Sequence, residues 1–511
     1  MKSPSLRFLL PSLLLIVFQT NAVAQTSSSA QVGQSIECIN GDAAGYPCSN
    51  IELLSFLPRA QMAGPDVSEV WGWYDPVDGH EYAIVGHRTG TNFVDVTDPS
   101  NPIYLGNLPI PTGSNGNSWR DMKTYQGYLY VVGDNAGPHG VQIFDLNTLR
   151  SVVSPPVTFA MTAHYTTDVA SAHNIAINEE TGFAYVVGDS GACGNGLYMM
   201  DLSSPEAPVF VGCHNDGGIT GLSSAGYVHD AQCVVYRGPD TDHANKEICF
   251  TASESDIAIV DVNDKGNPEL LANASYPTSR YVHQGWLTED HRYFIQGDEL
   301  DELNGTTTNT RTIIWDVADL DDPILFKEYL ASTTAIDHNL YVLGNLVYQA
   351  NYTSGMRILD ISDINDPIEV GFFDTVPGPA SAFDGAWGAY PFLPSGNVIV
   401  SSGNEGLFVL RPTGTVLANE DGPAASETNI EIFPNPVSQT ATIRYTNDSP
   451  GDVRVELFDV TGRSVEIIFD GRLPGGESLF KVDAIDLSAG TYVARISRDG
   501  ATSTLKVTVV R

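Results

Sequence analysis

The sequence predicts an all-β protein: a seven-bladed β-propeller closed by an N-terminal strand and followed by a small Ig-like β-sandwich. Three observations lead to this prediction. A unit of short apolar strands recurs along residues 51–413, separate alternating strands fill residues 429–511, and amphipathic helix patterns are absent. Four strands per recurring unit, at a nearly constant spacing, are typical of propeller blades.

The recurring unit is an apolar strand, an Asp/Pro turn and a second apolar strand. FVDVTDPSNPIYLG at residues 93–106 is one copy, and the Asp of its first strand returns at intervals of 44 to 60 residues. Related segments occupy residues 141–150, 197–212, 257–272, 312–327 and 356–371. Further apolar strands such as YAIVG, YLYVVG and FAYVVG lie upstream of the copies and complete four strands per unit. We expect the repeated Asp to be structural, accepting hydrogen bonds from turn N–H groups.

The seventh unit is incomplete. Residues 387–410 supply strands around NVIVSSG and GLFVL but stop before the Asp/Pro turn and a fourth strand. Residues 51–58, IELLSFLP, resemble PIYLGNLP at 102–109, which is the fourth strand of an earlier unit. We therefore expect the N-terminal strand to complete the last blade, because this closure removes unpaired sheet edges.

The N-terminus has the features of a secretory signal peptide over residues 1–24. Two basic residues precede an apolar stretch at 8–18, and AVA at 22–24 is a small-x-small cleavage site. The apolar stretch is short for a membrane span, and no later segment reaches about 18 apolar residues. An N-terminal membrane anchor is the weaker alternative. We expect a mature chain that begins near Gln25, is secreted or held at the cell surface, and has no membrane span.

Six cysteines indicate disulfides. An even number of cysteines in an exported chain favours disulfides, and a zinc site is disfavoured because no Cys-x-x-Cys pair occurs. Several connectivities are open, and proximity along the sequence favours Cys38–Cys48, Cys193–Cys213 and Cys233–Cys249. The first pair lies in an N-terminal segment, residues 25–50, and the last is expected to bridge neighbouring strands of the fourth blade.

The net charge limits the classes of partner. The chain has 62 acidic and 25 basic side chains, a formal charge of −37. Such an excess of acid argues against nucleic acid and against an anionic membrane surface, because no basic stripe is present to displace counterions. It suits solubility in salty surroundings or the capture of cations.

The C-terminal region resembles a secretion signal domain. Residues 414–428 form a small, polar linker without periodicity. In residues 429–511, the segments IFPNPVSQTATIRY, VELFDVTGRSV, LSAGTYVARI and LKVTVVR resemble the C-terminal sorting domain (type A) of the bacterial type IX secretion system. The resemblance implies recognition by that secretion machinery, export across an outer membrane, removal of the domain, and release or attachment at the cell surface. It also implies a source within Bacteroidetes-like lineages.

The preceding region resembles the choice-of-anchor B family, which is built from LVIVD-type repeats. The segments that carry the resemblance include CINGDAAGYPCSNIELLS, HGVQIFDLNTLR and HQGWLTEDHRYFIQGDELDE, and coverage runs over residues 38–411. Members share the propeller and differ in their C-terminal anchor, which fits a sorting domain here. The resemblance implies an architecture and no established reaction.

Aligning the units on their second strand places one residue of each innermost strand at the same phase. These residues are Trp71, Trp119, His173, His229, His283, His338 and Trp387. Polar residues follow several of them: Arg120, Asn174, Asp230, Gln284 and Asn339. The loops after the second strands lie on the same face and supply Asp134, Asp189, Asp298, Glu299, Asp301 and Glu302. One mouth of the channel is therefore expected to combine indole, imidazole and carboxylate groups.

Two kinds of site fit these residues. Neutral imidazoles with carboxylates are ligands for one divalent metal ion, a transition metal or zinc, here His173, His229, His283 and His338 with Asp298 and Asp301. Indole faces with polar groups suit a small-molecule, glycan or protein ligand at Trp71, Trp119, Arg120, Asp230, Gln284 and Trp387. The alternative is that Trp and His at a repeated phase only pack blade against blade.

No catalytic residue is predicted, since G-x-S-x-G, H-E-x-x-H and a phosphate-binding Gly loop are all absent. The leading hypothesis is a secreted or cell-surface binding module with its ligand site at the channel mouth. A metal-dependent hydrolase that uses Asp298 or Glu299 as general base at the same mouth is the first alternative. A structural surface-layer component is the second.

Overall fold

The computed structural model describes residues 29–189, 191–215, 217–218, 226–376 and 382–414, and most of 430–509. The gaps in the last stretch are residues 434–436, 438, 448–450, 460–463, 474–475, 486, 488–489 and 499–500. The predicted signal peptide and nearly all of the predicted linker lie outside the described residues. In the part of the chain that is described, no helix is long and apolar enough to cross a membrane.

Regular structure in the described residues is almost entirely β-strand, with two short 3-10 helices, η1 (Arg59–Gln61) and η2 (Leu146–Ser151). These strands form nine sheets, seven of which come from residues 42–412. In each of the seven, three strands pair in chain order and a fourth strand covers the outer edge.

The first sheet contains β4 (Val70–Tyr74), β5 (Glu81–His87), β6 (Gly90–Asp95) and β7 (Ile103–Pro109), with β11 (Val157–Thr158) parallel to β7. The second contains β8 (Arg120–Tyr125), β9 (Tyr128–Gly133), β10 (Val141–Asp145) and β12 (Ala163–Tyr165). The third contains β13 (Asn174–Asn178), β14 (Phe183–Val187), β15 (Leu197–Asp201) and β16 (Val209–His214). The fourth contains β17 (Asp230–Val235), β18 (Glu247–Ala252), β19 (Ile257–Asp261) and β20 (Glu269–Ala274).

The fifth sheet contains β21 (Val282–Leu287), β22 (Tyr293–Asp298), β23 (Arg311–Asp316) and β24 (Ile324–Leu330). The sixth contains β25 (Asn339–Leu343), β26 (Leu346–Ala350), β27 (Met356–Asp360) and β28 (Ile368–Phe373), extended by β2 (Tyr46–Ser49) and β1 (Asp42–Ala43). The seventh contains β29 (Ala386–Tyr390), β30 (Val398–Ser402), β31 (Gly406–Pro412) and β3 (Ile51–Pro58).

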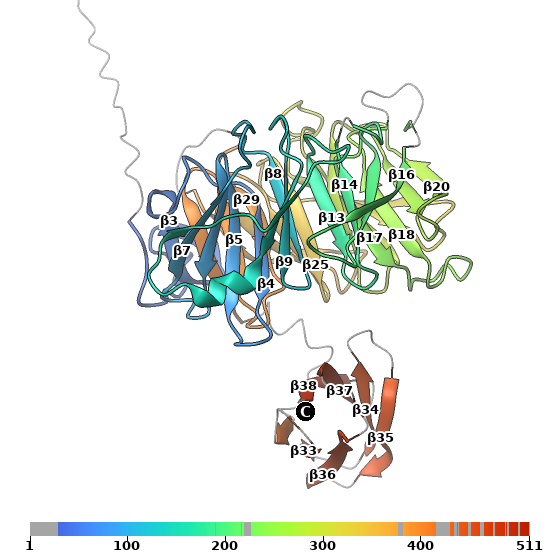
Figure 1. Ribbon diagram of the computed structural model, residues 1–511. Coiled ribbons are helices and arrows are strands. Elements are labelled where there is room, and N and C mark those ends of the chain that lie inside the picture. Colours follow the sequence, from blue (N-terminus) through green and yellow to red (C-terminus); the bar gives the residue numbers. More distant parts are fainter. Residues whose placement is uncertain are drawn as a thin grey trace, which may run out of the picture.

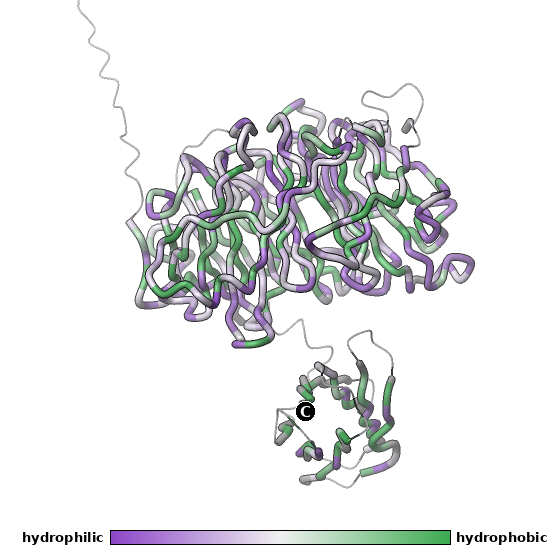
Figure 2. The backbone as a smooth tube through the Cα atoms, viewed as in Figure 1, coloured by the Kyte–Doolittle hydropathy of each residue, from purple (hydrophilic) through white to green (hydrophobic). Residues whose placement is uncertain are grey.

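The first strands of the seven sheets contact one another in turn. β4 contacts β8, and the series continues through β13, β17, β21 and β25 to β29, which contacts β4 again. Antiparallel four-stranded sheets in this arrangement are consistent with a propeller (Figure 1). Apolar residues follow the strands, and hydrophilic residues gather in the connecting loops (Figure 2).

β3 lies at the outer edge of the seventh sheet although it comes from the N-terminal region. It pairs antiparallel with β31, and one extra residue bulges from β3 at Leu54. Five other sheets have the same irregularity between their third and fourth strands. Phe56 of β3 is fully buried, with its ring 4.4 Å from that of Phe408. The shared bulge and burial explain why residues 51–58 resemble residues 102–109.

The three disulfides predicted from sequence proximity are present: Cys38–Cys48, Cys193–Cys213 and Cys233–Cys249. Cys233 of β17 lies directly opposite Cys249 of β18, so the third disulfide bridges neighbouring strands as expected. The first disulfide holds the N-terminal segment beside β2, which pairs with β28.

The C-terminal strands form two small sheets. One contains β32 (Ile430–Phe433), β33 (Thr440–Asn447) and β36 (Gly476–Asp483). The other contains β34 (Gly451–Asp459), β35 (Ser464–Leu473), β37 (Gly490–Arg498) and β38 (Ala501–Val509). Buried side chains from both sheets, among them Ile443 and Val455, pack in one apolar cluster.

Candidate functional site

The N-terminal ends of the first strands surround a cavity of about 990 Å³. We call it the imidazole cavity, because His173, His229, His283 and His338 all line it. Each of these histidines lies at or just before the start of a first strand, in four successive sheets. The repeat places the four histidines at equivalent positions of their first strands, so they lie level with one another around the cavity.

The four imidazoles form a continuous row. Ring centroids are separated by 4.0 Å between His173 and His229, and by 4.2 Å between His229 and His283. The row continues at 4.4 Å to His338, whose ring lies 5.0 Å from the indole of Trp387. Four positively charged rings at these separations would repel one another strongly, so the row does not carry four positive charges.

Backbone contacts fix the tautomer of two of these rings. Nδ1 of His229 is 2.8 Å from the carbonyl oxygen of His283, and Nδ1 of His338 is 2.5 Å from that of Trp387. A carbonyl oxygen only accepts hydrogen bonds, so Nδ1 carries the proton in both rings. Nε2 is then the nitrogen left for a ligand, as in metal-binding histidines whose other nitrogen donates to a carbonyl group.

Burial keeps these rings neutral. It lowers the pKa of His229 and of His283 well below the usual value, and the neighbouring imidazoles act in the same direction. It also lowers the pKa of His338 to about 3. The neutral form of imidazole is the one that binds a metal ion.

Glu299 lies beside two of the imidazoles. Its carboxylate oxygens are 3.8 Å from Nε2 of His283 and 3.9 Å from Nε2 of His338. One ligand atom from each of the three residues lies within 4.8 Å of the others, a geometry that can hold a metal ion. A tetrahedral zinc ion with ligands at about 2.0–2.2 Å holds neighbouring ligand atoms roughly 3.4 Å apart, so only a small adjustment is needed.

Glu299 is buried, and its protonation is set by two opposing effects. Burial raises the pKa of its carboxyl group to about 7, while the hydroxyl of Tyr352, which donates to Oε1 at 2.7 Å, acts to lower it. The side chain is therefore close to half ionised near neutral pH in the absence of a cation.

One side of the imidazole cavity offers a buried cation. Arg120 is 2% exposed, lines the cavity, and has no hydrogen-bond partner for its three guanidinium nitrogens among the described residues. Burial lowers the pKa of Arg120 to about 10, which leaves it charged at neutral pH. The indole of Trp119, half-exposed, lies next to it in the chain and lines the same cavity. This pair suits an anionic group on a ligand with an apolar part.

Three of the predicted ligand-binding residues lie elsewhere. Trp71, Asp230 and Gln284 line a second cavity of about 460 Å³, further along the same first strands, which we call the far cavity. The predicted position of Trp71 was wrong, because this residue does not lie level with Trp119 of the next sheet. Glu69 lies opposite Gly86, as Arg120 lies opposite Gly133, so Ser68 occupies the position of Trp119.

Side chains of the far cavity hold neighbouring sheets together. Oε1 of Gln284 accepts a hydrogen bond from the backbone N–H of Leu340 at 2.8 Å, and Oε1 of Gln232 accepts one from that of Leu287 at 2.8 Å. The indole N–H of Trp71 donates to the hydroxyl of Thr124 at 3.2 Å. These contacts satisfy the polar atoms within the fold.

Two predicted metal ligands, Asp298 and Asp301, do not join the imidazoles. Asp298 accepts hydrogen bonds from the backbone N–H groups of Arg280, at 2.8 Å, and Tyr281, at 2.7 Å. Asp301 accepts one from Nε of Arg311 at 2.6 Å. The chain turns after β22, so Glu299 alone from this acidic run faces the imidazoles.

The tyrosines of the site were missed by sequence reasoning. Tyr227, Tyr281 and Tyr352 line the imidazole cavity beside the histidines. Tyr227 and Tyr281 each lie two residues before a histidine of the row, in a repeated Tyr-Val-His sequence that could have indicated them. Tyr352 follows β26 and has no such signal.

Comparisons with known proteins identify two segments. Residues 431–510 match the family described as a secretion system C-terminal sorting domain, and residues 338–375 match the LVIVD repeat. The chain is therefore exported by the type IX secretion system, with a β domain that carries an LVIVD repeat. The sorting domain implies engagement with the secretion machinery and indicates secretion or attachment at the cell surface.

Two solved structures show distant likenesses to this chain. A protein from Lactobacillus plantarum has 11% identity and a TM-score of 0.43, and the match covers 82% of this chain and 100% of that one. PorZ, described as an essential bacterial surface component of the type-IX secretion system of Porphyromonas gingivalis, has 12% identity and a TM-score of 0.44. That match covers 91% of this chain and 64% of PorZ. A search of curated proteins found no match.

Proposed function

We propose that the seven sheets are the blades of a closed seven-bladed β-propeller spanning residues 51–413, and that residues 429–511 form a separate Ig-like sandwich. The contact of β29 with β4 supports closure of the ring. The bulge that β3 shares with other fourth strands supports its place in the last blade. The LVIVD match within the sixth sheet supports the choice-of-anchor B resemblance.

We propose that this propeller acts outside the cell as a binding module, with the imidazole cavity as its ligand site. The observation that carries the proposal is the row of four imidazoles beside Glu299, with the Nδ1 atoms of His229 and His338 hydrogen-bonded to backbone carbonyls. Histidines that only packed between the sheets would not need Nε2 to be free of backbone hydrogen bonds. Export by the secretion system is consistent with an extracellular ligand.

The first ligand that we propose is one divalent transition-metal or zinc ion. His283, His338 and Glu299 would hold it, and His229 is the nearest further imidazole. Mixed imidazole and carboxylate ligands favour zinc, copper or nickel over calcium or magnesium.

Isothermal titration of the chelator-treated protein with zinc, nickel and copper salts tests this proposal. We expect one ion per chain, with at least tenfold weaker binding after His283→Ala. His80→Ala is the matched control, because His80 is a half-exposed surface histidine paired with Asp95. If the metal ions do not bind, or if His283→Ala lowers stability equally with and without chelator, the histidines are packing residues.

The second ligand that we propose is a small organic anion that occupies the same cavity. Arg120 would pair with its anionic group, and Trp119 and Trp387 would contact its apolar part. A thermal-shift screen of carboxylates, phosphate esters and acidic sugars tests this with wild type and Arg120→Gln. Stabilisation that survives Arg120→Gln would contradict the assignment.

A metal-dependent hydrolase is a second candidate, because a carboxyl group with a pKa of about 7 beside a metal ion suits a general base. Glu299 would then be that base and not a ligand, leaving the imidazoles to hold the ion; Asp298 is excluded because its oxygens already accept three hydrogen bonds. Turnover of ester, phosphoester or glycoside substrates by the zinc-loaded protein, lost in Glu299→Gln, would favour it. Binding without turnover favours the binding module.

A further inference from the structure

A second group of acidic residues lies behind the imidazole cavity. Asp301 and Glu302 belong to the loop between β22 and β23, and Asp337 directly precedes His338. One carboxylate oxygen from each of the three lies within 4.8 Å of the others. The group joins the fifth and sixth sheets.

Two side chains of this group are buried, the third is partly buried, and all three are incompletely hydrogen-bonded. Asp301 is 0% exposed and Asp337 is 2% exposed. Oδ2 of Asp301 accepts from Nε of Arg311 at 2.6 Å, and Oε1 of Glu302 accepts from the backbone N–H of Arg311 at 2.9 Å. Within the described residues, Oδ1 of Asp301, Oε2 of Glu302 and Oδ1 of Asp337 are buried and accept no hydrogen bond from a backbone, amide, hydroxyl or basic donor. The carboxyl groups of Asp301 and Glu302 contact each other. Unpartnered buried oxygens are costly, so such a set needs an explanation.

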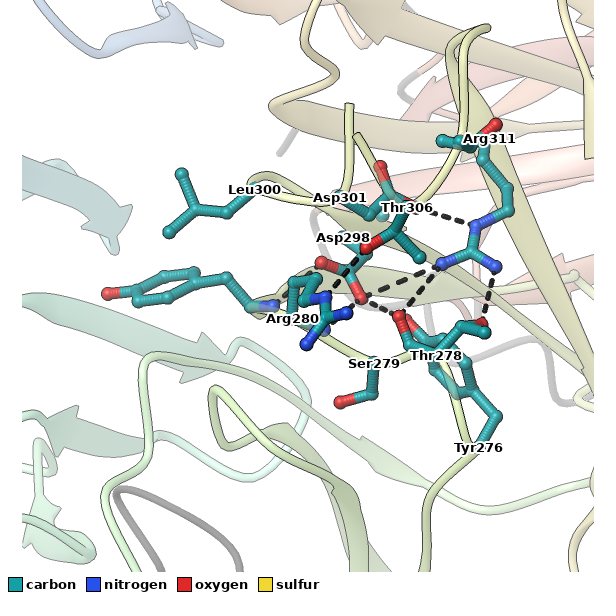
Figure 3. A network of polar contacts seen from close by, with 12 residues as sticks. Tyr276, Thr278, Ser279, Arg280, Asp298, Leu300, Asp301, Thr306 and Arg311 are labelled. Carbon is teal, nitrogen blue, oxygen red and sulfur yellow. Dashed lines mark hydrogen bonds and ion pairs between the residues drawn. The ribbon is translucent and has the colours of Figure 1, made fainter. Parts of the chain in front are cut away.

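Asp298, in the same network, shows what a satisfied carboxylate looks like here (Figure 3). It accepts hydrogen bonds from the hydroxyl of Tyr276 and from the backbone N–H groups of Arg280 and Tyr281. Arg311 lies within the network, bonded to Asp301 and to the hydroxyl of Thr278 at 2.9 Å. The fold thus supplies three donors to Asp298 and leaves oxygens of its neighbours unused.

The charges of the region do not balance. Asp298, Asp301, Glu302 and Asp337 bring four carboxyl groups, and Arg311 is the basic group in contact with them. The guanidinium of Arg280 turns to the hydroxyl of Thr306 at 2.6 Å. Excess negative charge in a buried place requires a bound cation or bound protons.

We propose that Asp301, Glu302 and Asp337 bind one calcium ion that links the fifth and sixth sheets. The donor atoms are all oxygens, which hard cations prefer, and no nitrogen or sulfur ligand belongs to the group. Calcium accepts six to eight oxygens at about 2.3–2.6 Å in irregular geometry, whereas magnesium demands a near-ideal octahedron. Three carboxylates without an octahedral arrangement therefore suit calcium better, and backbone oxygens or water would complete its coordination.

The proposed calcium site is independent of the imidazole site, although the two are neighbours. Glu299 and Asp301 lie in one loop, and Asp337 and His338 are adjacent, so each site shares its backbone with the other. Nitrogen donors at one site and oxygen donors at the other give them different metal preferences. Calcium binding can therefore be tested separately from the ligand proposed for the imidazole cavity.

Equilibrium dialysis of the full chain with radioactive calcium tests the proposal. After removal of metal with EGTA, we expect one calcium ion per chain, bound at roughly millimolar or lower concentration as in other extracellular modules. Calcium should also raise the melting temperature. Asp337→Asn should weaken binding at least tenfold, whereas His283→Ala should leave it unchanged. The matched control is Asp98→Asn, which alters an exposed acidic group in a turn and outside the candidate metal groups.

Two results would contradict the calcium proposal. If the EGTA-treated wild type binds no calcium at millimolar concentration, protons balance the carboxylates and the proposal is wrong. Retention of the bound ion by both Asp301→Asn and Asp337→Asn would place it elsewhere. If Asp337→Asn does not fold, the stoichiometry of the wild type and the affinity of Asp301→Asn give the answer.

Discussion

The imidazole cavity and the far cavity are formed by the same seven first strands, and the polar side chains of the two have opposite tasks. In the far cavity, Gln232 and Gln284 each accept a backbone N–H from a strand of the next sheet. In the imidazole cavity, His229 and His338 donate from Nδ1 to a backbone carbonyl and keep Nε2 for a ligand. The far cavity holds the sheets together, whereas the imidazole cavity presents unused groups.

The difference shows how to separate packing from binding in a repeat protein. Polar residues recur at equivalent positions for either reason, so recurrence alone does not decide. The count of hydrogen bonds does decide, because a side chain whose polar atoms are all satisfied by the fold has little to offer a ligand. By this criterion Arg120 and Glu299 belong to a site, and Gln284 belongs to the framework.

The largest effect should come from opening the ring that both cavities share. Phe56→Ala removes a fully buried side chain from β3 and its contact with Phe408, and we expect a loss of about 3–5 kcal/mol in the free energy of unfolding. Urea unfolding followed by tryptophan fluorescence measures it. Ile103→Ala, at a half-exposed site of β7, should cost under about 0.5 kcal/mol. A small effect of Phe56→Ala would mean that β3 does not close the ring.

The next effect tests the framework role of the far cavity. Gln284→Leu leaves the backbone N–H of Leu340 without its acceptor, so we expect a loss of about 1–3 kcal/mol. The loss should be the same with and without chelator, because no ligand is involved. If added metal restores the stability of Gln284→Leu, the division of tasks between the two cavities is wrong.

Sequence reasoning recovers most of the fold because strand, turn and repeat are local signals. The Asp/Pro turns, the closing strand and the three disulfides all follow from short segments. The histidines come together because each lies within one residue of the start of its first strand, although the hairpins that follow those strands differ in length. Trp71 does not join them, because Glu69, two residues earlier, occupies the position that Arg120 has in the second sheet.

Side-chain direction after a strand ends is the other property that sequence patterns do not supply. Asp298 is the last residue of β22, and the next residues lie in a loop. Within the acidic run, Glu299 faces the imidazoles and Asp301 faces Arg311. Only the loop conformation distinguishes them, and alternation along a strand no longer applies there.

A third prediction concerns the pH dependence of metal binding in the imidazole cavity. Burial lowers the pKa of His283 and His338 well below 6.5, so these rings stay neutral at pH 6. Glu299, with a pKa of about 7, must lose its proton to bind. Affinity for zinc should therefore fall about tenfold, or ~1.4 kcal/mol, for each pH unit below 7. Titrations at pH 5.5, 6.5 and 7.5 measure this, and Glu299→Gln should remove most of the dependence. A midpoint near 6.5 that persists in Glu299→Gln would assign it to histidine.

The smallest effect should come from removing the hydrogen bond that lowers the pKa of Glu299. The hydroxyl of Tyr352 donates to the Glu299 carboxylate at 2.7 Å and so favours its ionised form. Tyr352→Phe keeps the ring beside His338, whose centroid is 4.7 Å away, and removes only the donor. The pKa of Glu299 should then rise, and the pH at which zinc affinity is half lost should move upward by under one unit, about 0.5–1.3 kcal/mol. Tyr227→Phe is the control, since it removes a tyrosine hydroxyl from the same cavity while Tyr352 and its bond to Glu299 remain. Zinc titrations across the same pH series detect the shift, and an unchanged or lower midpoint in Tyr352→Phe would show that the carboxylate gains nothing from this donor.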